Sequence, residues 1–80
     1  MKFSRRSETL QISGQDVIIT ELSAAEFEQV MQVEGEAAKL ALMLQLSLGT
    51  DEDVMAWPNS VVTQLTTAVM NFNGMTDSPN

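Results

Sequence analysis

Residues 8–20 show two short patterns that are typical of β-strands. Leu10 and Ile12 alternate with polar neighbours, the turn-forming run Gly14-Gln15-Asp16 follows, and residues 17–20 are β-branched throughout. Two such runs around a short turn predict a β-hairpin over about residues 8–20. Because a lone two-stranded hairpin is marginally stable in water, its apolar face is expected to lie against helices.

A long helical pattern follows the hairpin. Ser23 can cap a helix, and Glu26, three residues later, can complete a capping box. Gly49 is placed to take the left-handed position after the last helical residue. These signals predict helix over about residues 24–48. Glu34, next to Gly35, falls within the apolar face of this helix. The pattern therefore leaves open whether the helix is continuous or bent near Gly35.

The apolar residues of this helix occupy two faces. If the helix is continuous, one stripe holds most of them: Phe27, Val30, Met31, Ala37, Ala38, Ala41, Leu44 and Leu48. Leu42, Met43 and Leu46 depart from that stripe, and Met43 and Leu46 project towards the polar side. We therefore expect Leu42, Met43 and Leu46 to form a second apolar surface, which is a candidate site for a partner protein or for self-association.

Two further helices are predicted in the last third of the chain. Thr50 can cap a short acidic helix over about residues 51–57, which Pro58 ends. A final helix is expected over about residues 59–73, ended by Gly74 in a Schellman cap that pairs Met75 with Met70. It carries a single apolar stripe, formed by Val61, Leu65, Ala68, Val69 and Phe72.

The predicted fold is therefore mainly α, with a short N-terminal β-hairpin and a small helical domain of a long, a short and a final helix. Residues 1–75 are expected to form one domain, and residues 76–80 a flexible tail. Trp57 is expected to pack between the last two helices, and Met31 and Met70 to lie in the core.

Composition narrows the chemistry that this chain can perform. It has 80 residues, with 11 Asp and Glu, 4 Lys and Arg, a formal net charge of −7, and no His, Cys or Tyr. Zinc sites of the Cys/His type, disulfides, and thiol or imidazole catalysis are therefore excluded within the chain. The acidic balance argues against nucleic-acid binding. No apolar run approaches the roughly 20 residues of a membrane span.

The remaining polar motifs favour structural roles. Residues 51–53 are three consecutive acids without the spacing of a calcium loop, and they suit a helix N-terminus. Glu34 and Glu36 point to different faces of a helix, which argues against a catalytic carboxylate pair. Ser60 only faintly resembles the serine of acyl carrier proteins that takes phosphopantetheine. We therefore expect no catalytic, cofactor-binding or metal-binding residues. The Arg5-Arg6 pair lacks the apolar segment of an export signal.

Several segments together resemble the tail assembly chaperones of long-tailed phages and prophages. These are the stretch Asp16–Glu28, which reads DVIITELSAAEFE; the alanine- and leucine-rich stretch Ala37–Leu48; the stretch Asp53–Leu65, which reads DVMAWPNSVVTQL; and the close Asn71-Phe-Asn-Gly. The likeness covers roughly residues 8–75. None of its motifs has an invariant chemical signature.

The resemblance implies a non-enzymatic protein that binds the tape measure protein, a long, hydrophobic and helical chain. Such a chaperone keeps the tape measure protein soluble, helps tail tube protein to polymerise around it, and is absent from the mature virion. It is expected in the host cytoplasm, without a cofactor. The resemblance leaves open a further partner, a longer form of this chain made by ribosomal frameshifting. Self-association into a homo-oligomer also stays open.

Two other functions remain open on the sequence alone. The chain could be a small structural component of a virion or of another complex. It could also be an acidic inhibitor of a basic protein, in which case its binding should weaken steeply with salt.

Overall fold

An antiparallel β-hairpin opens the fold. The computed structural model describes residues 1–75, and in it β1 (Ser7–Ile12) pairs with β2 (Gln15–Thr20). Ser13 and Gly14 connect the strands with φ angles of 51° and 79°, and two positive φ values are what a two-residue type I′ turn requires. The predicted hairpin is confirmed, but its turn lies one residue earlier than expected.

One face of the hairpin carries the apolar side chains. Leu10 is opposite Val17 in the strand register, and these two residues, with Ile12 and Ile19, pack with the core. Ile18 points to the other face and is 60% exposed. The alternation along the strands therefore gives the hairpin one face to cover and one face in solvent.

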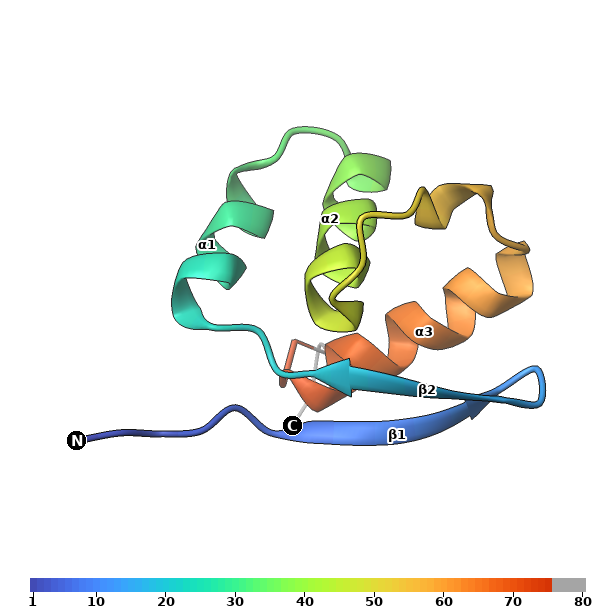
Figure 1. The fold of residues 1–80 in the computed structure, drawn as a ribbon. Coiled ribbons are helices and arrows are strands. Elements are labelled where there is room, and N and C mark those ends of the chain that lie inside the picture. Colours follow the sequence, from blue (N-terminus) through green and yellow to red (C-terminus); the bar gives the residue numbers. More distant parts are fainter. Residues whose placement is uncertain (76–80) are drawn as a thin grey trace, which may run out of the picture.

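The helices cover that apolar face. They are α1 (Ala24–Gln32), α2 (Glu36–Leu48), the single 3₁₀ turn η1 (Val54–Ala56) and α3 (Asn59–Phe72). Figure 1 shows all of them on the same side of the hairpin, with α2 between α1 and the segment that carries η1. The predicted class, helices after an N-terminal hairpin, is confirmed.

The core draws side chains from both strands and from every helical element. Ile19, Leu44 and Leu65 are almost completely buried, and they come from β2, α2 and α3. Ser47 is the one buried polar residue among those described, and its hydroxyl donates to the Thr20 carbonyl at 2.9 Å. The most deeply buried part of the core thus lies between the hairpin, α2 and α3, and Val30 of α1 and Val54 of η1 complete it.

The helix expected over 24–48 is two helices, which corrects the prediction. Ser23 and Glu26 form the predicted capping box at the start of α1. The chain leaves α1 at Val33 in an extended conformation, and Gly35 has a φ of +94°. That φ is unfavourable for any residue with a Cβ. Gly35, at which the sequence pattern allowed either a continuous or a bent helix, therefore separates two helices and lets α2 turn back beside α1 (Figure 1).

This break changes which residues reach the core. Phe27 and Met31 are 37% and 54% exposed, and Ala37 and Ala38 are also exposed. The expected single stripe and the core position of Met31 are therefore wrong. The stripe assumed one continuous helical phase, whereas α1 and α2 pack independently of each other.

The predicted helix over 51–57 is also wrong. Only Val54–Ala56 form a 3₁₀ turn, and Asp53 precedes it without a side-chain cap. The Thr50 hydroxyl instead accepts a hydrogen bond from the Glu52 backbone N–H at 3.2 Å. Such a local turn competes with helix formation, so the three acids of 51–53 lie in an irregular segment.

The final helix agrees with the prediction to within one residue. Gly74 has a φ of +67°, and the Met75 N–H donates to the Met70 carbonyl at 2.8 Å. The Gly74 N–H donates to the Asn71 carbonyl at 3.2 Å, and the two bonds together make a Schellman cap. Met70 packs against the core, as expected. The tail predicted at 76–80 lies outside the described residues.

Polar contacts join the start of β1 to the end of α3. Arg6 donates to the Phe72 carbonyl at 2.9 Å, and its guanidinium lies 4.7 Å from the centroid of the Phe72 ring. Asn73 accepts a hydrogen bond from the Leu22 N–H at 2.9 Å and donates to the Val69 carbonyl at 2.8 Å. The bonds of Arg6 and Leu22 fasten the end of α3 to the residues just before β1 and just after β2.

Glu21 belongs to the same contact region. The Arg6 backbone N–H donates to the Glu21 carboxylate at 3.1 Å, and the guanidinium of Arg6 lies 3.3 Å from it. The backbone hydrogen bond first, and then the guanidinium, lower the pKa of Glu21 below its usual value of 4.5.

Within the described residues, no helix is long and apolar enough to cross a membrane.

Replacing Gly35 by Ala should lower the free energy of unfolding by about 1–2 kcal/mol, because the added Cβ disfavours the positive φ. An added Cβ at this position meets no other atom within 4 Å, so the loss would come from the backbone alone. Urea denaturation measures the effect, with the exposed neighbour Glu34→Ala as the control that should change little. A Gly35→Ala protein that is more stable than wild type would contradict the break between α1 and α2.

Replacing Glu21 by Gln should destabilise the protein in a pH-dependent way. Because the folded-state pKa of Glu21 is lowered, the stabilisation is present above its usual pKa of 4.5 and is lost as the pH falls through the folded value. Urea denaturation at several pH values should therefore find wild type more stable than Glu21→Gln near neutral pH, with the difference vanishing in acid. A difference that stays constant into acid would contradict the assigned role of Glu21.

Candidate functional site

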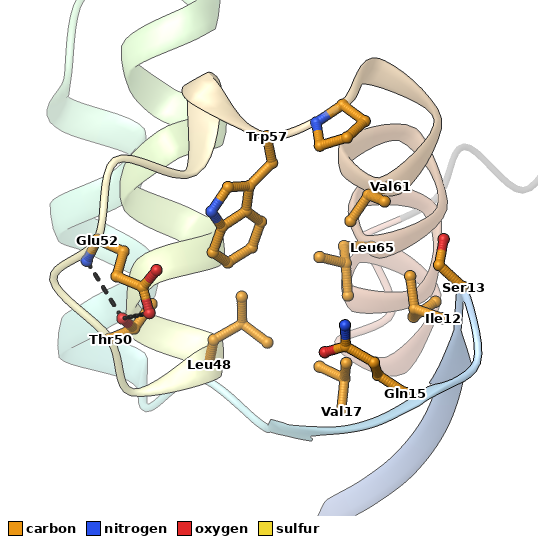
Figure 2. A pocket seen from close by; sticks show the side chains of 11 residues that line it. Ile12, Ser13, Gln15, Val17, Leu48, Thr50, Glu52, Trp57, Val61 and Leu65 are labelled. Carbon is orange, nitrogen blue, oxygen red and sulfur yellow. Dashed lines mark hydrogen bonds between the residues drawn. The ribbon is translucent and has the colours of Figure 1, made fainter.

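A groove of about 600 Å³ lies at the turn end of the hairpin. Its walls come from that end of the hairpin, from the end of α2 with the segment after it, and from the start of α3. Figure 2 shows Trp57 and Leu48 on one side, with Val61, Leu65, Ile12 and Val17 across from them. The residues that line the groove are Ile12, Ser13, Gln15, Val17, Leu48, Thr50, Glu52, Trp57, Pro58, Val61 and Leu65.

Local structure fixes each wall. The type I′ turn pairs Gln15 with Ile12, so Val17 takes the inner face of β2 by alternation. Gly49, with a φ of +67°, ends α2 directly after Leu48. Val17 on β2 and Leu48 on α2 therefore meet the groove with apolar side chains, and Gln15 on the same face of β2 adds an amide.

Trp57 is held at the junction between η1 and α3. The backbone N–H of Trp57 donates to the Val54 carbonyl at 3.2 Å, which closes the 3₁₀ turn. The Trp57 backbone is extended, with ψ at 160°. The residue before a proline is restricted to extended conformations, so Pro58 imposes this geometry. Trp57 is half-buried and packs against the core. The expected packing between two helices is not what the structure has, because the segment before Trp57 is a 3₁₀ turn and the groove separates Trp57 from Val61 and Leu65 on α3.

The rim of the groove is polar and acidic. Glu52 lines the groove, and Asp51 and Asp53 on either side of it are exposed. Gln45 on α2 donates to the Glu52 carbonyl at 2.9 Å, and Thr50 exchanges hydrogen bonds with Glu52, drawn as dashed lines in Figure 2. The acidic segment is therefore fastened to α2. None of the residues that line the groove is basic.

The three residues predicted to bind a partner do not form one surface. Met43 is only 3% exposed and belongs to the core, so the expectation that it lies on an outer face is wrong. Leu42 and Leu46 are partly buried and pack against the core. Because α2 begins anew after Gly35, its core face is set by Met43, Leu44 and Ser47.

Leu46 does line a second, more open hollow. This hollow is bordered by the ion pair between Arg5 and Glu26, whose atoms are 3.0 Å apart, and by Gln45, Gly49, Thr50 and Asp51. Its lining is mostly polar, so it offers less apolar surface than the groove beside Trp57. A role of Leu42 and Leu46 in partner binding stays a prediction.

The polar motifs noted in the sequence are spread over the surface. Glu34 and Glu36 are exposed on either side of the break between the helices, and Ser60 is exposed in the first turn of α3. Within residues 1–75, no three carboxylates are placed to hold a metal ion together.

The groove residues were missed by the sequence analysis because their pattern is that of core residues. Leu65 and Val61 fall on the apolar stripe of the last helix, and Ile12 and Val17 belong to the hairpin alternation. The single Trp and the acidic run at 51–53 were the only local signals near the groove. They did not indicate which strands or helices they would meet.

Comparison with known proteins adds no relative. No protein-family model matches the chain, and no curated protein or solved structure is significantly similar to it.

Proposed function

We propose that this protein is a non-enzymatic phage tail assembly chaperone that binds the tape measure protein. The proposal combines two sources of support: the resemblance of residues 8–75 to such chaperones, and a groove suited to protein binding. The observation that carries it is the groove of about 600 Å³, which joins apolar walls to an acidic rim in a chain of net charge −7.

The resembling segments fall at positions with structural meaning. The stretch 16–28 comprises most of β2 and the capped start of α1, and 53–65 contains η1, Trp57 and the start of α3. The close at 71–74 forms the Schellman cap of α3. The stretch 53–65 contains Trp57, Pro58, Val61 and Leu65, which line the groove, so the resemblance includes part of the groove.

The proposed action is the covering of apolar side chains on an unassembled client. A long hydrophobic helix exposes an apolar stripe that would otherwise drive aggregation. Apolar walls can cover part of that stripe in a helix-in-groove manner, while the surrounding acids keep the complex soluble. The client is released when tail tube protein takes over the same stripe. No bond is made or broken in this cycle, so the role needs no catalytic group.

Co-expression with the longest helical protein encoded just downstream, which the proposal takes as the tape measure protein, tests the proposal. We expect the tape measure protein to remain in the soluble fraction only when this chain is present, and to co-purify with it at about 0.5 M salt, where exposed charge pairs are strongly screened. An unrelated acidic protein of similar size is the control.

Three results would contradict the proposal. The tape measure protein could be soluble alone and fail to co-purify. The chain could remain in purified virions, which would make it a structural component. Its complexes could dissociate completely at about 0.5 M salt, which would mean that charge alone holds them together and would favour an acidic inhibitor of a basic protein.

A further inference from the structure

We infer that the groove beside Trp57 binds the apolar side chains of an amphipathic helix whose neighbouring positions carry Lys or Arg. The inference deepens the proposed function and rests on it for the identity of the natural partner. It assigns the binding to groove residues, with Val17, Trp57 and Val61 as contacts and Glu52 as the charged residue at the rim.

The layout of the groove is that of a protein interface more than that of a small-molecule site. Most of the side chains that face its interior are apolar and come from three separate parts of the chain; Thr50 and Glu52 lie at one edge, and the Gln15 amide also projects into the groove. An apolar centre within a polar rim is typical of interfaces between proteins, and Trp is enriched among the residues that dominate their binding energy. The volume of about 600 Å³ is large enough for side chains to insert.

A helix fits this opening better than an added strand. The hairpin contributes the inner-face side chains of Ile12 and Val17 to the groove, so a partner meets side chains there and not the free hydrogen-bonding edge of a strand. Side chains one turn apart on a helix project from the same face. Two such residues can enter one groove while the helix lies across the rim.

Charge selects the partner's polar residues. Glu52 lines the groove, and the lining contains no Lys or Arg. Arg5 and Arg6 are paired with Glu26 and Glu21, and Arg5 borders the second hollow beside Asp51, so neither of these arginines lines the groove. The groove therefore lies beside an excess of negative charge, which favours Lys or Arg on a partner and repels Asp or Glu.

Two synthetic peptides test this inference directly. Both carry the same leucine face and form amphipathic helices, but the polar face of one is lysine and that of the other is glutamate. Trp57 is the only Trp of the chain and lines the groove, so its fluorescence reports occupancy. We expect a saturable blue shift with the leucine–lysine peptide, and at least about tenfold weaker binding of the leucine–glutamate peptide at about 0.15 M salt.

Matched variants locate the binding. Glu52→Lys and Glu36→Lys change the net charge equally, but only Glu52 lines the groove. Val17→Glu and Ile18→Glu alter adjacent residues on opposite faces of β2. We expect Glu52→Lys and Val17→Glu to weaken the leucine–lysine peptide about tenfold or more, and both controls to stay within about twofold. Circular dichroism checks that each variant folds. If Val17→Glu does not fold, the comparison of Glu52→Lys with Glu36→Lys tests the site, because both residues are exposed.

Several results would overturn the inference. Equal weakening by Glu36→Lys would mean attraction to the acidic chain as a whole. Equal binding of the two peptides would contradict the charge argument. A blue shift of Trp57 that grows with protein concentration, without peptide, would mean that a second copy fills the groove.

The same variants separate this inference from the proposed function. If Glu52→Lys and Val17→Glu fold and still keep the tape measure protein soluble, the groove assignment fails and the chaperone function stands. If peptide binding follows the expected pattern but the tape measure protein is not solubilised by wild type, the groove assignment stands and the proposed function fails.

Discussion

The fold depends on covering one face of a two-stranded hairpin. Such a hairpin has few internal contacts and is marginally stable by itself, so its apolar side chains must be buried by other elements. Here α2 and α3 supply that cover, and Ile19, Leu44 and Leu65 meet in a seam almost closed to solvent. The hydrogen bonds of Arg6 and Asn73 then tie the end of α3 back to the strands. The break at Gly35 allows α2 to turn back beside α1 and to reach the hairpin.

Features set by neighbouring residues could be predicted from the sequence. The capping box at Ser23, the left-handed Gly49 and the Schellman cap at Gly74 each depend on a few consecutive side chains, and all three are present. Features that depend on packing could not be predicted in the same way. Met31 and Met43 exchanged their expected environments, because the helical phase was extended through Gly35 and the positive φ at that residue ends it.

The groove also arises from packing between distant segments. The turn end of the hairpin, the end of α2 and the start of α3 approach one another without filling the space between them. Each wall residue by itself has the pattern of a core residue, and only the assembled fold distinguishes the two roles. Hydrogen bonds to Gln45 and Thr50 hold the acidic rim at Glu52 in place. The covering that stabilises the hairpin thus leaves at its turn end the apolar surface on which the proposed function rests.

The most direct test of this account is a map of backbone amide NMR shifts as a helical tape measure segment is added to the labelled protein. The account predicts that the largest changes cluster at Val17, Trp57 and Val61, together with the amide of Glu52. Phe27 and Met31 on α1 are the exposed apolar pair that serves as the internal comparison. Changes confined to that pair, with the groove amides unmoved, would contradict the account.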